Sequence, residues 1–362
     1  MSKNILEVSL SPDLGGLELF MVQCYEYFKQ KGNVKIVVAP HKKLDAYLHY
    51  ESQKIYVTRN KFFPVIPALK LAKIIDKYDI DIVHFHWTKD IATVVLGKLM
   101  SKKKPKIIQS RHMTMTRFKD DFYHRWLYKN IDMMHAVTYQ VKEQLEKFIP
   151  KDIRPDIVVV HSGVQEPTVD PLTIENLKEK YQLQKSFTVG IVGRIEEKKG
   201  QWIVIEALAK LKKMNMKALI IGHAMDEEYL DSLKKKVLQI GMEEKIIFTG
   251  FTKDVNEHIK LCDVTVLATP KETFGLVVIE SMINSVPVIA TKNGGPLEII
   301  EDGVDGIFFN RSIDDLVQKI QYLYENEEIV EKLSKNAYKK VKSKFDKEKQ
   351  LEQLYRFIEE EK

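Results

Sequence analysis

Residues 187–212 read FTVGIVGRIEEKKGQWIVIEALAKLK and contain the unit from which we expect the whole chain to be built. The apolar run Phe187–Val192 predicts a buried strand. A charged, glycine-containing turn follows, and then Trp202–Lys212 has the apolar spacing of a helix. A short apolar strand, a turn and a helix form the repeating element of a parallel sheet covered by helices on both faces.

The same alternation continues along most of the chain. In the first half, apolar runs predict strands at Asn4–Leu10, Val34–Ala39, Ile82–His86, Lys106–Ser110, Met134–Thr138 and Ile157–His161. In the second half, they predict strands at Phe187–Val192, Ala218–Ile221, Ile246–Thr249, Val264–Ala268 and Val288–Thr291. A chain of 362 residues exceeds one ordinary hydrophobic core, so we expect an α/β protein with two doubly wound, Rossmann-like domains.

The join between the two domains is expected in Gln165–Asn176. Pro167 and Pro171 disfavour helix for the residue before each of them, and we therefore place a linker here. This gives an N-terminal domain at residues 1–165 and a C-terminal domain at residues 166–345. Facing sheets of this kind bind ligands at the carboxyl ends of their strands, so we expect a cleft between the domains.

The rest of the chain adds a charged helical stretch at Ser334–Glu361, of which residues about 346–362 are expected to pack back on the first domain. No apolar run is long enough to cross a membrane, and Met1–Leu10 reads as a strand with no signal-peptide pattern, so we expect a cytoplasmic protein. The two cysteines, Cys24 and Cys262, predict neither a disulfide framework nor a cysteine metal site.

Charge is distributed unevenly between the two halves. Residues 1–165 contain 27 Lys and Arg against 17 Asp and Glu, a net charge of +10, which leaves −4 for the remainder of a chain whose total is +6. A basic half indicates an anionic partner, such as a membrane surface, phosphate groups or nucleic acid.

Two turns between a strand and a helix are candidate anion sites. Gly15 and Gly16 would let backbone amides approach an anion at a helix start, although such a turn also needs glycine for its dihedral angles alone. In the second half, Arg194 and Lys199 follow a strand directly, and two converging cations suit a diphosphate. The alternative for these two residues is a solvated charge run.

The segment from Glu272 to Glu280 gives the strongest signal. Gly275 and Leu276 would offer free amides at a helix start, while Glu272 can accept hydrogen bonds from sugar hydroxyls. Glu280 follows three apolar residues on a helix that is largely buried, and a carboxylate in that setting needs a partner. Ribose hydroxyls would supply one.

Several motifs occur together in a fixed order: Gly193-Arg194 with Lys199-Gly200, Phe274-Gly275-Leu276 between Glu272 and Glu280, Pro287 to Thr291, and Gly294-Gly295 with Glu298. In this combination the chain resembles the family 4 (group 1) retaining glycosyltransferases of GT-B fold. The resemblance spans nearly the whole chain. The first half matches through Gly15-Gly16, the strand end at His84 and His86, and His112.

The resemblance implies a role for each matching residue. Arg194 and Lys199 would bind the donor diphosphate, and Glu280 the nucleotide ribose. Glu272 would hold the donor sugar together with the segment formed by Thr273, Phe274, Gly275 and Leu276, and His112 would lie near the reacting sugar. Gly163 stands in Ser-Gly-Val-Gln where the family often has Asn-Gly-Val-Asp, so there only its amide would contact the donor.

The activity that the resemblance implies is transfer of a sugar from a nucleotide-diphosphate sugar, with UDP as the expected nucleotide, and with retention of configuration. No carboxylate of the first half is placed like the nucleophile of a retaining glycosidase, so we expect the departing diphosphate itself to help remove the acceptor proton. Asp79-Ile80-Asp81 lies at the amino end of its predicted strand, away from the cleft. We expect neither a metal nor a cofactor.

The acceptor is expected to be a glycan or a lipid-linked, polysaccharide or lipopolysaccharide molecule of the cell envelope. Lys61 to Pro67 with Lys70, Lys73 and Lys77, and the lysines of 102–106, could dock on an anionic membrane, or they could be packed apolar residues with solvated lysines. Two other functions remain open: a nucleotide-sugar epimerase of the same fold, and a non-enzymatic protein that binds an anionic polymer. The lysines form no recognisable nucleic-acid module.

Overall fold

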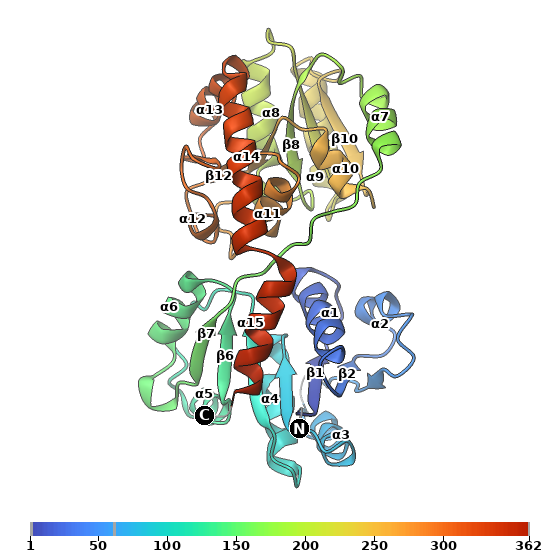
Figure 1. Cartoon of the computed structure of the whole chain (residues 1–362), viewed down its shortest axis with the longest axis vertical. Helices are drawn as coiled ribbons and strands as arrows, with labels where there is room; N and C mark the ends of the chain where they lie inside the picture. Colours follow the sequence, from blue (N-terminus) through green and yellow to red (C-terminus); the bar gives the residue numbers. More distant parts are fainter. Residues whose placement is uncertain (1–2, 61–62, 361–362) are drawn as a thin grey trace. The chain divides into compact units, whose positions relative to one another are not determined.

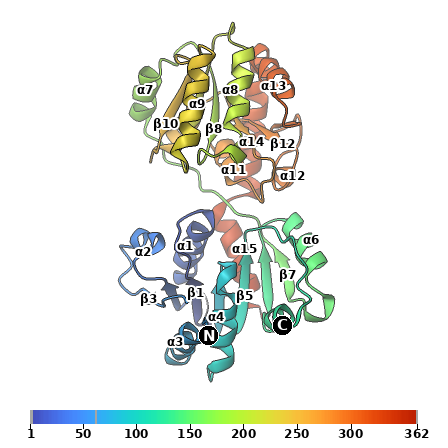
Figure 2. The same ribbon diagram turned by 180° about the vertical axis from the view of Figure 1, so that it is seen from behind.

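The computed structural model describes residues 3–60 and 63–360 and divides into two compact units. The first unit comprises residues 1–162 and 348–362, and the second comprises residues 163–347. Each unit contains one parallel sheet with helices on both faces (Figures 1 and 2). This confirms the predicted α/β fold class with two Rossmann-like domains.

The first unit is built around a seven-stranded sheet in the order β3-β2-β1-β4-β5-β6-β7. Its strands are β1 (Ile5–Ser9), β2 (Val34–Val38), β3 (Ile55–Tyr56), β4 (Ile82–Phe85), β5 (Lys106–Arg111), β6 (Met133–Ala136) and β7 (Asp156–Val159). Its helices are α1 (Gly16–Lys29), α2 (Lys43–Tyr47), α3 (Val65–Lys77), α4 (Ile91–Met100), α5 (Phe122–Tyr128), α6 (Tyr139–Phe148) and α15 (Lys347–Glu359), with short 3-10 helices η1 (Thr88–Asp90) and η2 (Lys151–Ile153).

The last helix, α15, packs on the first unit although the second unit precedes it in the chain. Its buried residues Leu351, Leu354 and Ile358 belong to the same apolar cluster as Phe28 of α1 and Ile5 of β1. Burial of this apolar stripe stabilises α15 against the sheet. Figures 1 and 2 show α15 on one face of the sheet and α4 on the other.

The second unit is built around a six-stranded sheet in the order β10-β9-β8-β11-β12-β13. Its strands are β8 (Phe187–Val192), β9 (Met216–Ile221), β10 (Ile246–Gly250), β11 (Val264–Leu267), β12 (Val288–Thr291) and β13 (Ile307–Phe309). Its helices are α7 (Pro171–Lys180), α8 (Gln201–Lys210), α9 (Glu227–Gln239), α10 (Val255–Lys260), α11 (Leu276–Ile283), α12 (Pro296–Ile299), α13 (Ile313–Glu325) and α14 (Glu327–Lys344), with the 3-10 helix η3 (Glu197–Lys199).

Strand β9 shows how the sequence builds the two-sided core. Ala218 and Ile220 pack with α8, α9 and α13, whereas Leu219 and Ile221 pack with α7 and α10 on the other face. Successive side chains of a strand point to opposite faces, so a strand covered on both sides must be apolar throughout.

Both sheets have a point where the strand order reverses, between β1 and β4 in the first unit and between β8 and β11 in the second. Loops after these neighbouring strands run in opposite directions and leave a crevice at the carboxyl edge, where ligands bind in open parallel sheets. In the second unit the loops that leave β8 and β11 carry Gly193 to Gly200 and residues 268–275. The loops at the reversal point of the second sheet are therefore the ones that contain the predicted site residues.

The structure differs from the sequence expectations at two places. Pro171 lies in the expected linker but begins α7, because Asp170 caps the helix and proline is tolerated in the first turn. The charged helical stretch expected over Ser334–Glu361 contains a break at Phe345 and Asp346, which separates α14 from α15. Phe345 is buried, and its carbonyl accepts a hydrogen bond from the amide of Val164 at 2.9 Å.

Across residues 3–60 and 63–360, no helix is both long enough and apolar enough to cross a membrane.

Candidate functional site

The loop after β8 presents the two predicted diphosphate-binding cations. Arg194 is 54% exposed, and its Nη2 lies 3.3 Å from Oε1 of Glu196. Lys199 is partly buried, and its Nζ lies 3.2 Å from Oε2 of Glu272, which follows β11. The two loops that flank the reversal point are therefore joined by an ion pair between predicted site residues.

Close backbone packing fixes the position of the Glu272 loop. The carbonyl of Glu272 accepts a hydrogen bond from the amide of Gly295 at 3.0 Å. Gly294 has a φ of +72°, and a Cβ added there would lie 2.0 Å from the Glu272 carbonyl oxygen. Only glycine can occupy this position without displacing Glu272.

Helix α11 begins at this loop with its first amides uncapped by a side chain. Gly275 is the N-cap residue, has a φ of +96°, and supplies no side-chain cap. Phe274 before it is buried and anchors the loop, while the Thr273 amide donates to the Glu272 carboxylate at 3.2 Å. The Val278 amide already donates to the carbonyl of Gly275 at 2.9 Å, so the amides of Leu276 and Val277 are the ones that point out of the helix N-terminus, which attracts an anion.

Glu280 lies on the second turn of α11 and is half-buried. Burial raises the pKa of its carboxyl group. Within the described residues its carboxylate has no hydrogen-bond or ion-pair partner, and only its backbone carbonyl is bonded, to Nδ2 of Asn284 at 2.9 Å. A partly buried carboxylate without a partner costs stability, so this group is suited to a ligand donor.

Gly15 and Gly16 lie at the start of α1, after β1. The Gly15 amide already donates to Oε2 of Glu18 at 2.8 Å, which forms a capping box. An anion at this helix start would therefore meet the amide of Gly16 and the carboxylate of Glu18. Gly163, the other predicted amide donor, packs against the backbone of Lys347, which a Cβ would approach to 2.6 Å.

His112 follows β5 at the carboxyl edge of the first sheet. Its ring packs against Phe20, with ring centroids 4.9 Å apart, and stacks on His86 at 5.8 Å. Its Nε2 is buried and has no hydrogen-bond partner among the described residues. Burial, followed by the nearby charges of His86 and other groups, lowers the pKa of His112 well below the usual range, so the ring is neutral.

His84 and His86 are both buried, and both contact the carboxylate of Glu7 on β1 at 2.8 Å. The sequence pattern marked these two histidines but gave no indication of Glu7, Ser110 or His135, with which they form a hydrogen-bond network. The signal was available in part, because Glu7 is a charged residue in the middle of an apolar strand.

One group of three potential metal ligands lies within the described residues. The donor atoms of Glu7, His84 and His86 are all within 4.8 Å of one another, but each already takes part in a hydrogen bond of the network. Asp79 and Asp81 lie at the amino end of β4, as expected from the sequence, and there both pair with Lys103, at 2.8 and 2.9 Å.

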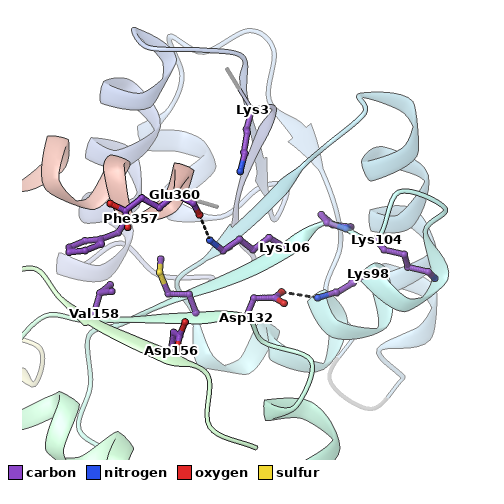
Figure 3. A pocket seen from close by; sticks show the side chains of 11 residues that line it. Lys3, Lys98, Lys104, Lys106, Asp132, Asp156, Val158, Phe357 and Glu360 are labelled. Carbon is purple, nitrogen blue, oxygen red and sulfur yellow. Dashed lines mark hydrogen bonds and ion pairs between the residues drawn. The ribbon is translucent and has the colours of Figure 1, made fainter. Parts of the chain in front are cut away.

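A large cavity of the first unit, of about 610 Å³, lies away from these residues (Figure 3). Lys3, Lys106 and Asp156 line it at the amino ends of β1, β5 and β7. Lys106 donates there to the carbonyl of Glu360 at 3.1 Å. Since ligands bind parallel sheets at the opposite edge, this cavity contributes no candidate catalytic residue.

Comparison with protein families gives one match in each half of the chain. The family described as "Glycosyltransferase Family 4" matches residues 14–166, and the family "Glycosyl transferases group 1" matches residues 173–340. The second range contains every candidate residue from Arg194 to Glu280, and the first contains Gly15, Gly16, His112 and Gly163.

Individual proteins agree with this result. The N-acetyl-alpha-D-glucosaminyl L-malate synthase of Bacillus anthracis is 27% identical over 80% of this chain and 77% of its own length. A glycosyltransferase from Rickettsia africae has a TM-score of 0.88, with 24% identity over 98% of both chains. Anabaena HepE, solved in complex with UDP and glucose, has a TM-score of 0.84, with 19% identity over 99% of both chains.

Proposed function

Since the chain belongs to the group 1 glycosyltransferases of GT-B fold, we propose that it moves a sugar from a UDP-sugar to a glycan or lipid-linked acceptor of the cell envelope, with retention of configuration and without a metal. HepE, which shares the fold, is known in complex with UDP and glucose, and this supports UDP as the nucleotide. The second unit would be the donor domain and the first the acceptor domain.

The observation that carries the proposal is the arrangement around the start of α11. A helix N-terminus without a side-chain cap lies next to the Lys199–Glu272 ion pair. On the second turn of the same helix, the carboxylate of Glu280 has no partner in the described part of the chain. A nucleotide diphosphate sugar has the matching groups: phosphates for the amides and Lys199, a ribose for Glu280, and sugar hydroxyls for Glu272.

The chemistry would follow from stabilisation of the leaving group. As the bond between the sugar and the diphosphate breaks, negative charge grows on the phosphate oxygens, and Arg194, Lys199 and the first amides of α11 would oppose it. These fixed charges would do the work that a metal ion does in other transferases. The neutral ring of His112 would contact the sugar without repelling its developing positive charge.

We further propose that α3 brings the first unit to an anionic membrane surface. Val65, Ile66 and Leu69 are 46%, 61% and 47% exposed, and Lys70 and Lys73 are exposed on the same helix. Of the sequence segment that indicated this surface, Lys61 and Phe62 lie outside the described residues. Exposed apolar side chains beside lysines are typical of helices that lie on membranes.

Flotation with vesicles tests this surface. Binding to vesicles that contain phosphatidylglycerol, lost in Ile66→Glu and kept in Leu172→Glu, would support it. Leu172 is 74% exposed in the second unit and is a matched control for the added charge. Equal flotation of all three proteins, or none for the wild type, would contradict it.

Time-resolved proton NMR tests the transferase itself. Many transferases slowly pass the sugar to water, so the chain is mixed with α-linked UDP-sugars and the released sugar is followed. We expect the α-anomer to appear first, before mutarotation. Initial release of the β-anomer would contradict retention, and conversion of the UDP-sugar to an epimer would identify an epimerase.

The control for this assay is a pair of adjacent lysines. Lys199→Ala should abolish release of the sugar, whereas Lys198→Ala should not, because Lys198 is exposed and only Lys199 contacts Glu272. Equal loss in the two variants would indicate a general effect of charge. Full activity in both would show that Lys199 has no part in the reaction.

A further inference from the structure

A row of buried polar side chains crosses the first sheet near its carboxyl edge. Glu7 of β1, His84 of β4, Ser110 of β5 and His135 of β6 are each 0% exposed. The sheet register places Glu7 opposite His84 and Ser110 opposite His135. Apolar residues would pack here at lower cost, and buried polar groups of this number are retained where they serve a function.

The row is a continuous chain of hydrogen bonds. Its contacts are His86 Nε2 to Glu7 Oε2 at 2.8 Å, Glu7 Oε1 to His84 Nδ1 at 2.8 Å, His84 Nε2 to Ser110 Oγ at 2.8 Å, Ser110 Oγ to His135 Nδ1 at 2.7 Å, and His135 Nε2 to the carbonyl of Val160 at 2.7 Å.

The carbonyl of Val160, at one end of this row of hydrogen bonds, determines which group donates in each of the next bonds. A carbonyl only accepts, so His135 donates from Nε2. Burial lowers the pKa of His135 to about 3, and its neutral ring must accept at Nδ1 from the Ser110 hydroxyl. Ser110 has then used its one proton and accepts from Nε2 of His84.

The bond between His84 and Glu7 therefore needs one further proton. His84 already carries a proton on Nε2, so the 2.8 Å contact at Nδ1 holds either an imidazolium and a carboxylate or a neutral imidazole and a carboxylic acid. In both cases Oε2 of Glu7 is an acceptor. His86 must consequently donate to it from Nε2.

With the proton of His86 on Nε2, the Nδ1 atom of the same ring is unprotonated and can only accept a hydrogen bond. Burial lowers the pKa of His86 to about 4, so the ring carries only the Nε2 proton near neutral pH. Nδ1 is buried and has no hydrogen-bond partner among the described residues, and the ring stacks on His112, whose buried Nε2 also has none.

We propose that Glu7 is a positioning residue for sugar transfer: it holds His86 in the Nε2–H tautomer and in the orientation that supports the ring of His112. The proposal rests on the transferase function for its kinetic consequence. Glu7 contacts no substrate in this account. Its effect reaches the reaction through the stacked pair of imidazoles, as the carboxylate behind a catalytic or metal-bound histidine does in other enzymes.

Two substitutions at Glu7 separate positioning from charge. In Glu7→Gln the side-chain oxygen can still accept from His86 while the amide donates to a neutral His84, so all contacts survive without the extra proton. In Glu7→Leu they are lost. We expect Leu to lower kcat roughly 10- to 100-fold with an unchanged Kd for UDP, and Gln to restore kcat to within about threefold of the wild type.

Ser110→Ala is the matched structural control. This substitution removes buried hydrogen bonds of the same row. His84 can then carry its proton on Nδ1 and donate to Glu7, and Glu7 still accepts from His86. We expect a loss of stability similar to that of Glu7→Leu with only a small change in kcat. Should Glu7→Leu fail to fold, the comparison of Glu7→Gln with Ser110→Ala still tests the account.

Nitrogen-15 NMR of the histidine rings provides a readout that does not depend on activity. We expect the Nε2–H tautomer for His86 in the wild type, Glu7→Gln and Ser110→Ala, and a mixture in Glu7→Leu. An Nδ1–H tautomer in the wild type, a kcat in Glu7→Gln as low as in Glu7→Leu, or one equivalent of zinc bound at Glu7, His84 and His86 would overturn the proposal. Absence of transfer by the wild type with the expected tautomer would refute the proposed function only.

Discussion

Nζ of Lys199 lies 3.2 Å from Oε2 of Glu272 in the second unit. These residues are predicted to bind opposite ends of the donor, the diphosphate and the sugar, yet without donor they neutralise each other. The carboxylate would compete with the phosphates for Lys199. We therefore expect binding of UDP alone to weaken this pair, whereas a UDP-sugar would also gain hydrogen bonds from its hydroxyls to Glu272.

Glu272→Gln should therefore tighten the binding of UDP and reduce the preference for the UDP-sugar over UDP. We expect UDP to bind roughly two- to fivefold more tightly, since a partly exposed ion pair contributes up to about 1 kcal/mol. The advantage of the UDP-sugar over UDP should shrink, because bonds to a charged group are about twice as strong as neutral ones. Calorimetry with both ligands measures this, and Glu197→Gln, an exposed acid beside Lys199, controls for net charge.

We expect the carboxylate of Glu280 to bind the ribose hydroxyls of the nucleotide. In Glu280→Gln we expect UDP to bind roughly 10- to 100-fold more weakly, because hydrogen bonds to a charged group contribute about 1.5–3 kcal/mol. The wild type should prefer UDP over 2′-deoxy-UDP, and the variant should lose that preference. Because the carboxylate has no partner in the described part of the chain, the free variant should be more stable than the wild type. An undiminished preference for UDP would remove Glu280 from the site.

A pair of glycines tests the role of backbone packing under Glu272. Gly294 and Gly303 have nearly equal φ values, +72° and +73°, but only at Gly294 would a Cβ meet a backbone atom, the Glu272 oxygen at 2.0 Å. Gly303→Ala should lower the free energy of unfolding by about 1–2 kcal/mol, the cost of the left-handed conformation. Gly294→Ala should cost more and also weaken binding of the UDP-sugar. Denaturant unfolding and calorimetry check both, and equal behaviour of the two variants would contradict the packing account.

Asp90 gives the first unit a pH-dependent stability. Burial raises the pKa of this carboxyl group to about 7, although the Leu10 amide donates to it at 2.8 Å. The folded chain then binds a proton that the unfolded chain, with a pKa near 3.8, releases. The free energy of unfolding should fall as pH rises from about 4 to about 7, by at most about 1.4 kcal/mol per pH unit, and level off above 7.

Asp90→Asn should remove this dependence, since the amide oxygen can still accept from Leu10. Urea unfolding of both proteins between pH 4 and pH 8 measures the difference. We expect the variant to gain stability relative to the wild type across this range, with little difference at pH 4. A constant difference over the whole range would show that Asp90 is ionised in the folded chain.

The sequence predicted most strands of both sheets to within a few residues, because a strand buried on both faces must be an apolar run, as Phe187–Val192 is. It did not predict the short edge strands β3 and β13. It also missed the start of α7 at Pro171, which depends on local capping. The main donor-site candidates were identified because they lie in short segments that follow predicted strands, Arg194 and Lys199 after one strand and Glu272 to Glu280 after another. The predicted family of the chain is confirmed. The roles of the individual residues stay predictions.

The sequence shows Glu7 as a charged residue in an apolar strand, but the contacts of the network around it could not be predicted. Glu7 and His84 are 77 positions apart, and only the parallel register of β1 and β4 places them opposite each other. The sequence singled out His84 and His86 only as a strand end that matches the family. Their actual arrangement, with both on the same carboxylate, depends on a contact between strands that periodicity does not encode.

The most direct test of the central claim is the dissociation constant of a UDP-sugar for the wild type, Arg194→Ala and Lys198→Ala. Calorimetry against UDP-, GDP- and ADP-sugars first identifies the donor that binds. We expect tight binding of a UDP-sugar by the wild type and by Lys198→Ala. Binding by Arg194→Ala should be at least tenfold weaker, because this variant would lose a charged contact to the diphosphate. Equal affinity of all three proteins, or no binding of any nucleotide sugar, would contradict it.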